Sequence, residues 1–376
     1  MFTTTMQSPE ATLTHGGQTA EIHDNELVDR YLDLIHGERL NWTSHHKLNR
    51  LLGSGGQGVV YLTERRGADD FTLPVALKFF SPARYTDSRS YDEAMSRIAR
   101  VAAHVAQIQQ DNLLDVHNFV DRNRIRLMVM EWIDGYDLRH LMNPMMLERV
   151  KHRVSEKRWE YLNRVVVTQG PTQPRFQPGV AVAVVRDCLA ALAALHREEI
   201  VHSDIKPSNI MLKRTGNAKI VDIGSAFELK EPPAQRTCTP CYAAPEVIEG
   251  AEISPKSDLA SLGYVLIELL AGQSPFTQPM NYKEMLEFKR RLPKMLETLL
   301  PADVTCNELL MSFCRGLIAP DPGKRFPSAE DADLLKTGAA AFHRQLVVSN
   351  MSSEYDNEIR LWIEELREIE DRENQG

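Results

Sequence analysis

The first third of the chain holds short runs in which apolar and polar residues alternate, each bounded by Gly, Pro or Asp. This pattern predicts β-strands, and the runs cover residues 47–52, 58–63, 73–80, 114–120 and 125–131. An Ala-rich stretch among them, residues 90–110, has a helical pattern. Beyond Gly135 the pattern is mostly helical, and the clearest helices are predicted at 181–197, 257–272 and 283–299. We therefore expect a small β-rich half followed by a larger α-rich half.

Three segments lie outside this two-part pattern. Residues 1–25 are polar and Thr-rich, which predicts disorder, and residues 25–37 have the pattern of a short helix. The segment 141–178 joins a basic stretch, a β-like run at 165–168 and a Pro-rich stretch. We expect it to be an insertion looped out on the surface. Its Arg and Lys residues could dock an acidic partner, but a solvated face is the plainer expectation.

The last part of the chain, residues 354–372, has the pattern of an acidic helix. Its apolar residues repeat at 3-4-3 spacing and form one stripe; they are Ile359, Trp362, Leu366 and Ile369. Two heptads are too few to indicate a coiled coil, so we expect this helix to pack back on the domain. The helix and the 141–178 insertion are also the candidate surfaces for a soluble regulator or for self-association.

Composition narrows the class of protein. The chain has 376 residues and a net charge of −8, which fits a large two-lobed domain with tails and argues against a nucleic-acid-binding protein. No apolar run reaches the ~20 residues of a membrane span; the best candidate, 180–195, contains Arg186 and Asp187. Five Cys without framework spacing, and no secretory signal, predict reduced thiols and a cytoplasmic location. The single C-x-x-C, Cys238 and Cys241, lacks a partner pair and is taken as coincidence.

A glycine-rich loop, "LLGSGGQGVVYL" at 51–62, carries the first candidate chemistry. Glycines allow a backbone to approach phosphates closely; here they are Gly53, Gly55, Gly56 and Gly58. A dinucleotide-binding loop would need a helix directly afterwards, whereas a β-branched run follows, so the loop is predicted to be a hairpin. Lys78 ends the next apolar strand, "VALK", and its ammonium group can neutralise phosphate oxygens in a cleft.

Five further motifs follow in order. They are "HSDIKPSN" with Asp204, Lys206 and Asn209; "VDIGSAF" with Asp222; Ala244-Pro245-Glu246; a helix beginning near Asp258; and "DPGKRF" with Arg325. Together with the glycine loop and Lys78, over roughly residues 45–340, they resemble the signature set of eukaryotic-like (Hanks-type) serine/threonine protein kinases. The resemblance implies an α+β, bilobal fold, with a small β-rich N-lobe that has one main helix and a larger, mostly α-helical C-lobe.

The resemblance also implies ATP and Mg²⁺ as ligands and a protein as substrate. Asp204 would be the catalytic base, Lys206 would steady the γ-phosphate and mark Ser/Thr specificity, and Lys78 would hold the nucleotide phosphates with the glycine hairpin. Asn209 and Asp222 would bind the metal, because Mg²⁺ prefers hard oxygen ligands.

Other residues receive roles from the same resemblance. In the hinge sequence "LMVMEWIDGYDL" (127–138), Met130 would stand beside the adenine. The remaining nucleotide contacts would be the backbone of Glu131 and of Ile133 or Trp132, the Asp137 side chain at the ribose, and Val60 and Ala76 on the faces of the adenine ring. In the C-lobe, Thr239 would bond Asp204 and Lys206, Asp258 would tie down the catalytic loop, and Arg325 would pair with Glu246.

These motifs divide the chain. We expect a tail with a short helix at 1–44, a kinase domain at 45–345 and a C-terminal acidic helix at 346–376. Within the domain the N-lobe covers about 45–130, the hinge 131–135, and the C-lobe 136–345, with the insertion at about 141–178.

The chain departs from the family pattern at two positions. Ser203 stands where the family usually has Arg, whose guanidinium receives a phosphate on the activation loop. We therefore hypothesise that activity does not depend on phosphorylation through that route, for which Thr237 is the best-placed site.

The second departure is Val101, which falls where a helix Glu should pair with Lys78. Val105 then joins an apolar spine with His202, Val116 and Ile223. The only acids on this helix are Asp92 and Glu93. Glu93 would reach Lys78 only in a shifted register that puts Arg97 on the spine, so a displaced or absent pair is the favoured interpretation.

Three functions remain open from the sequence. An active serine/threonine kinase has the most support, because all four chemical groups are present. A pseudokinase scaffold draws support from Val101 and Ser203. A kinase of small molecules is disfavoured, since those relatives generally lack the Ala-Pro-Glu segment and the Lys two residues after the catalytic Asp.

Overall fold

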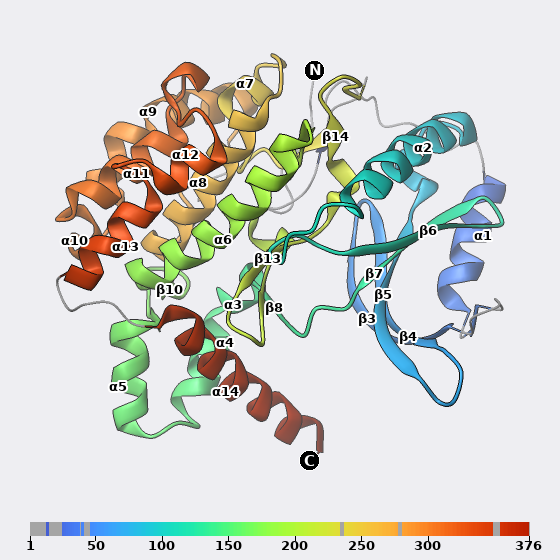
Figure 1. Cartoon of the computed structure of the whole chain (residues 1–376), viewed down its shortest axis with the longest axis horizontal. Helices are drawn as coiled ribbons and strands as arrows, with labels where there is room; N and C mark the ends of the chain where they lie inside the picture. Colours follow the sequence, from blue (N-terminus) through green and yellow to red (C-terminus); the bar gives the residue numbers. More distant parts are fainter. Residues whose placement is uncertain are drawn as a thin grey trace.

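A computed structural model describes residues 13–14, 25–37, 39–40, 46–233, 237–276, 280–348 and 354–375. A six-stranded sheet forms the smaller lobe, with the order β2-β3-β4-β5-β7-β6 and antiparallel neighbours throughout (Figure 1). Its strands are β2 (Arg39–Leu40), β3 (His46–Gly55), β4 (Gly58–Arg66), β5 (Thr72–Phe80), β6 (Val116–Arg122) and β7 (Ile125–Glu131). The five strands expected from alternation are confirmed, with ends that move by a few residues.

Two helices pack on this sheet, α1 (Asn25–His36) and α2 (Ser88–Val105). Helix α2 begins at a capping box, in which the Asp87 side chain accepts from the Ser90 N–H at 2.7 Å. The expected helix over 90–110 is too long. The Ile108 N–H donates to the Val105 carbonyl, three residues back, at 2.9 Å. This tight turn ends the helix and leads the chain into β6.

The larger lobe is built around long helices. They are α6 (Pro178–Arg197), α8 (Pro255–Ala271), α9 (Tyr282–Leu299), α11 (Glu308–Ile318) and α13 (Ala339–Val348), with the shorter α3 (Leu138–Leu141), α7 (Pro245–Ile248), α10 (Ala302–Thr305) and α12 (Ala329–Leu334). Helix α8 is buried along nearly its whole length and ends at Gly272, whose φ of 64° suits a residue without a Cβ. Of the described helices, α6 alone is long and apolar enough to cross a membrane, and 72% of that apolar stretch is buried inside this lobe.

Short paired strands hold the loops that lie between the two lobes. Strands β8 (Gly135–Asp137), β12 (Ile210–Lys213) and β13 (Ala218–Ile220) form one small sheet. The other pairs are β9 (Val167–Thr168) with β10 (Arg175–Phe176), β11 (Ile200–Val201) with β14 (Phe227–Glu228), and β1 (Leu13–Thr14) with β15 (Thr237–Cys238). The β12–β13 hairpin and β11 bracket the segment that carries Asp204.

The segment 141–178 is not looped out, so that expectation was wrong. It forms α4 (Pro144–Lys151) and α5 (Glu156–Val165), and the Leu147, Val150 and Leu162 side chains are 0–1% exposed. Apolar positions at helical spacing were hidden among the basic residues. One residue of the basic stretch pairs with an acid of the same chain: the Arg158 Nε donates to Glu365 of α14 (Tyr355–Gln375) at 2.6 Å.

Helix α14 packs back on the larger lobe, as predicted from its apolar stripe, and it runs beside α4 (Figure 1). Trp362 is 1% exposed, and its ring meets Phe176 edge-on at a centroid distance of 5.6 Å. Ile359, Leu366 and Ile369 are also buried. The insertion and α14 therefore share one apolar interface rather than presenting two free surfaces.

Trp362→Ala is expected to destabilise the fold by about 3–5 kcal/mol, because it leaves a large cavity between α14 and β10. The melting temperature should fall by roughly 5–10 °C in a thermal-shift or circular dichroism measurement. Glu368→Ala on the exposed side of the same helix is the control and should change it by about 1 °C or less. Equal shifts for both variants would contradict this packing.

Candidate active site

The loop that carries Asp204 is fixed by one buried carboxylate. Asp258, at the start of α8, accepts from the backbone N–H of His202 at 2.9 Å and of Ser203 at 2.8 Å. The His196 Nε2 lies 2.9 Å from the same carboxylate. Ser203 has a left-handed backbone with φ of 67°, a conformation that a non-glycine residue keeps only when its surroundings enforce it. The predicted tie between Asp258 and this loop is confirmed.

Three buried side chains meet at Asp204, from Thr239, Lys206 and Asn209. The Asp204 Oδ1 accepts from the Thr239 hydroxyl at 2.7 Å, and its Oδ2 lies 2.9 Å from the Lys206 Nζ. The Asn209 amide donates to Oδ2 at 3.2 Å and to the Asp204 carbonyl at 2.8 Å. The Lys206 Nζ also donates to the Thr239 hydroxyl at 3.2 Å. This network orients a carboxylate that can accept a proton from an incoming hydroxyl group.

Asp222 lies next to Asn209 because of the β12–β13 hairpin. The N–H of Val221, the preceding residue, donates to the Asn209 carbonyl at 2.9 Å. The Asp222 Oδ1 accepts from the Gly224 N–H at 3.0 Å and pairs with Lys78. Burial by itself raises the pKa of Asp222, but the Lys78 ammonium and these hydrogen bonds outweigh it and lower the pKa to about 2. The Asp222 carboxylate is therefore ionised at neutral pH.

This pair suits a hard divalent cation. The Asn209 Nδ2 is used by Asp204, which leaves its Oδ1 as the atom that can ligate a metal. An ionised carboxylate beside an amide oxygen matches the ligands that Mg²⁺ prefers. The donor set therefore fits the metal that the sequence predicts.

Lys78 lies on β5 opposite Val60 of β4 and Met128 of β7. Its ammonium group pairs with Asp222 and donates to the Gln57 Oε1 at 2.7 Å. The Gln57 amide in turn donates to the Ser225 hydroxyl at 2.9 Å. The tip of the glycine hairpin is thus tied to the segment that follows Asp222, a contact that sequence reasoning missed.

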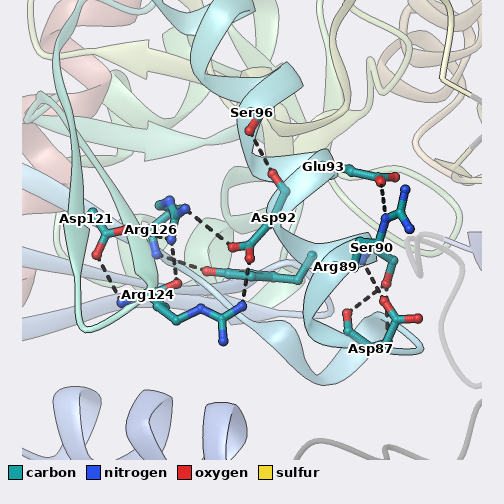
Figure 2. Close-up of polar contacts among 10 residues, drawn as sticks. Asp87, Arg89, Ser90, Asp92, Glu93, Ser96, Asp121, Arg124 and Arg126 are labelled. Carbon is teal, nitrogen blue, oxygen red and sulfur yellow. Dashed lines mark hydrogen bonds and ion pairs between the residues drawn. The ribbon is translucent and has the colours of Figure 1, made fainter.

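The two acids of α2 do not reach Lys78. Figure 2 shows Asp92 between Arg124 and Arg126, at 2.7 and 3.4 Å, and Glu93 beside Arg89 at 2.9 Å. Neither acid contacts Lys78 within the described residues. The displaced or absent pair that the sequence favoured is therefore what the structure shows.

Val101, at the expected position of the acid, is buried. It lines a cavity of about 260 Å³ between α2 and the Gly224–Phe227 segment. Val105 is also buried, and so are the other residues of the expected apolar spine: Val116, His202 and Ile223. Helix α2 thus contributes apolar contacts here rather than a charge.

The glycine hairpin has the geometry of a phosphate-binding loop. Gly55 pairs with Gly58, and Gly58 has a φ of 138°. A Cβ at Gly58 would lie 1.8 Å from the Phe79 carbonyl oxygen, so only glycine fits. A Cβ at Gly53, Gly55 or Gly56 would have no atom within 4 Å. The backbone of this hairpin is therefore open to a ligand.

The predicted adenine contacts lie where β5 and β7 pair. Ala76 is opposite Met130, and these side chains are 5% and 8% exposed. The Glu131 N–H donates to the Asp115 carbonyl at 3.0 Å, and the Glu131 carboxylate pairs with Lys219. Ile133, two residues further along, is 8% exposed.

Asp137 serves a structural purpose that the sequence did not suggest. Its Oδ1 accepts from the His140 N–H at 2.8 Å and caps α3. Burial raises its pKa. The Asp137 Oδ2 is the oxygen that the helix cap leaves for a contact with a ribose.

Two further contacts hold the segment after Thr239. Arg325 and Glu246 form the predicted pair through two hydrogen bonds of 2.6 and 2.7 Å. Lys289 of α9 was not predicted. It is 0% exposed, donates to the Cys241 carbonyl at 2.6 Å and lies over the Tyr264 ring at 3.8 Å. The only signal in the sequence was a Lys inside the apolar stripe of its helix.

The protein kinase domain family matches residues 46–333. The chain belongs to this family. The resemblance given by the motifs is thus confirmed.

Curated relatives include bacterial serine/threonine-protein kinases. PrkC of Bacillus subtilis is 26% identical over 80% of this chain and 41% of its own length. PknL of Mycobacterium bovis is 30% identical over 62% of this chain and 51% of its own length. PknD of Mycobacterium tuberculosis is 28% identical over 83% of this chain and 42% of its own. The kinase chain spans about half or less of the length of these relatives.

A solved structure supports the fold. The crystal structure of the Mycobacterium tuberculosis PknI kinase domain matches with a TM-score of 0.53 and 21% identity, over 82% of this chain and 98% of that one. The bilobal α+β kinase fold expected from the motifs is confirmed.

Gln57→Ala should strengthen ATP binding roughly two- to fivefold, because the Gln57 amide occupies the Lys78 ammonium group that phosphates would approach. Gln57→Glu should weaken binding by at least the same factor, since a second carboxylate at Lys78 repels phosphates. Isothermal titration calorimetry with ATP and Mg²⁺ measures both. Weaker binding in both variants would show that Gln57 holds the nucleotide instead.

Proposed function

We propose that this chain is an ATP-dependent serine/threonine protein kinase that transfers the γ-phosphoryl group to Ser or Thr hydroxyls of a protein substrate. The observation that carries the proposal is the buried network in which Thr239, Lys206 and Asn209 orient the Asp204 carboxylate. The same hairpin brings Asp222 next to Asn209, and Asp222 pairs with Lys78. These groups come from four separate stretches of the chain and meet at one site.

In the proposed reaction Asp204 accepts the proton of the substrate hydroxyl as its oxygen attacks the γ-phosphorus of ATP. The bond between the γ-phosphorus and the bridging oxygen breaks, and ADP leaves. Lys206, whose Nζ lies 2.9 Å from the Asp204 Oδ2, steadies the transferred group. Thr239 fixes the rotamer of Asp204, so the catalytic oxygen faces the substrate.

Nucleotide binding divides between the lobes. Lys78 would bind the phosphates together with the glycine hairpin, through Gly53, Gly55, Gly56 and Gly58. The proposed contacts of the adenine are Val60, Ala76, Met130, Glu131 and Ile133, and the proposed contact of the ribose is Asp137. Asn209 and Asp222 would hold Mg²⁺, which supplies charge neutralisation for the phosphates when bound. We also propose the cytoplasm as its compartment, because ATP is available there and no disulfide joins the cysteines of the described residues.

A nucleotide-binding scaffold is the second candidate. The absence of an acidic partner for Lys78 on the described helix α2 favours it. The argument against a scaffold is that the chain has all four groups that phosphoryl transfer needs and brings them to one site. They are Lys78, Asp204, Asn209 and Asp222.

Asp204→Asn should lower phosphoryl transfer from radiolabelled ATP to a generic basic protein by about 100-fold or more, because the amide cannot accept the substrate proton. ATP binding should stay within about twofold, since the phosphates contact other groups. Chelation of Mg²⁺ should abolish transfer in the unaltered protein. Asp69→Asn, on an exposed turn, is the matched control. Transfer that is equally absent in the unaltered protein, with ATP still bound, would favour the scaffold.

Thr237→Ala should leave most of the activity intact. Ser203 cannot form the bidentate, charge-assisted bond through which Arg links an activation-loop phosphate to the catalytic loop. The initial rate with saturating ATP is the measurement, with protein dephosphorylated by a phosphatase as a parallel sample. A loss of about 100-fold in either sample would contradict the hypothesis.

A further inference from the structure

The last helix, α14, reaches the short strand that carries the proposed ribose contact. In β8, Tyr136 pairs with Leu212 of β12 and Asp137 pairs with Met211. Successive residues of a strand point to opposite faces, so the Tyr136 and Asp137 side chains leave β8 on different sides. The Tyr136 hydroxyl donates to the Glu370 Oε2 of α14 at 2.7 Å. Glu370 therefore holds the residue that directly precedes Asp137.

The Glu370 carboxylate joins a small cluster of two rings. Its second oxygen, Oε1, lies 3.8 Å from the His140 Nε2. The Tyr136 and His140 rings stack with their planes 8° apart and their centroids at 5.3 Å. Burial raises the pKa of Tyr136, and the hydrogen bond to Glu370 raises it further, so the hydroxyl stays protonated at neutral pH and continues to donate. Glu370 therefore has one oxygen near each of the two side chains.

His140 connects this cluster to Asp137. Its backbone N–H donates to the Asp137 Oδ1 at 2.8 Å, the bond that caps α3. A cap bond restricts the capping side chain as well as the N–H that it receives. Because the His140 ring is held by Tyr136 and Glu370, its backbone is held too, and the Asp137 carboxylate keeps one orientation. The cap leaves the Asp137 Oδ2 for another donor.

We propose that Glu370 is a positioning residue for ATP, which holds the Asp137 carboxylate so that its Oδ2 accepts from a ribose hydroxyl group. It acts through the Tyr136 and His140 side chains. The inference rests on the proposed kinase function and deepens it, because it gives a role in ribose binding to a residue outside the family match at 46–333. The contacts of Glu370 are partly exposed, so we expect an effect on affinity of roughly two- to fivefold.

Isothermal titration calorimetry of the full chain with Mg²⁺ compares ATP with 2′,3′-dideoxy-ATP, which lacks both ribose hydroxyl groups. Glu370→Ala should weaken ATP binding roughly two- to fivefold and leave the binding of the dideoxy analogue within about 1.5-fold. Asp137→Ser keeps a capping oxygen and removes the second one. It should weaken ATP binding by about tenfold and abolish the preference for ATP over the analogue. Equal losses for both nucleotides in Glu370→Ala, or no loss, would overturn the inference.

The transfer assay with the generic basic protein is run in parallel and separates this inference from the proposed function. Transfer by the unaltered protein, together with a preference for ATP that Asp137→Ser does not change, would overturn the inference and leave the kinase function standing. The absence of both transfer and ATP binding in the unaltered protein would overturn both.

Glu365→Ala is the matched control, because it removes an acid from the same helix. Its polar partner among the described residues is Arg158 of α5, whose Nε lies 2.6 Å from the Glu365 Oε1. ATP binding in this variant should stay within about 1.5-fold. A loss equal to that in Glu370→Ala would mean that any weakening of α14 lowers the affinity, and it would overturn the specific action of Glu370.

Two more variants test the route through Tyr136. Glu370→Gln retains an oxygen that accepts from the Tyr136 hydroxyl and should keep ATP binding within about 1.5-fold of the unaltered protein. Tyr136→Phe removes only the hydroxyl, and adding it to Glu370→Ala should cause no further loss, since both changes break the same contact. Additive losses in the double variant would contradict the route. Melting temperatures within about 2 °C of the unaltered protein establish that each variant is folded.

Discussion

The buried carboxylate of Asp258 is the contact on which the geometry of the site depends. It receives two consecutive backbone N–H groups, from His202 and Ser203, and holds Ser203 in a left-handed conformation. Without it, buried donors would lose their partners, which costs about 1–3 kcal/mol for each group. The loop that bears Asp204 is thereby anchored to α8, a helix that is buried along nearly its whole length.

The same helix also anchors the opposite side of the site. Ser257, the neighbour of Asp258, donates to Glu246 at 2.8 Å, and Glu246 holds Arg325. Glu246 ends the segment that begins with Thr239. One helix therefore fixes both the loop with the carboxylate and the segment with the hydroxyl that orients it. This explains how Asp204 and Thr239, 35 residues apart, keep a 2.7 Å contact.

The positive charge of Lys78 is balanced by a different residue from the one usual in this family. Lys78 is 4% exposed and would be costly to bury without a partner. Since no acid of α2 reaches it, Asp222 of the opposite lobe provides the compensating charge. The two departures in the sequence both replace a charged side chain of the family pattern. Val101 leaves α2 without a charge for Lys78, and Ser203 has no guanidinium group that could receive a phosphate.

The sequence predicted what depends on local spacing and missed what depends on long-range packing. The glycine hairpin, the "HSDIKPSN" loop and the Arg325–Glu246 pair were correct because each motif specifies its own backbone geometry or a partner known from the family. Gln57 could not be foreseen as a partner of Lys78, since a loop-tip amide carries no periodic signal. The insertion was misjudged because its charged residues obscured the helical spacing of its buried apolar positions, such as Leu147, Val150 and Leu162. Helix α14, which packs against the insertion, was predicted to pack on the domain. An apolar stripe on a helix does not specify the surface against which the helix packs.

Helix α14, which lies outside residues 46–333 of the family match, supports the hinge. Arg367 of α14 pairs with Asp134, and the Tyr136 hydroxyl donates to Glu370 at 2.7 Å. These groups are partly exposed, so each contact stabilises the fold by only about 0–1 kcal/mol. The burial of Trp362 and its neighbours supplies the binding free energy, and the polar contacts set the position of the helix along the lobe. Asp134 and Tyr136, two polar side chains of the hinge sequence, are therefore held by the last helix.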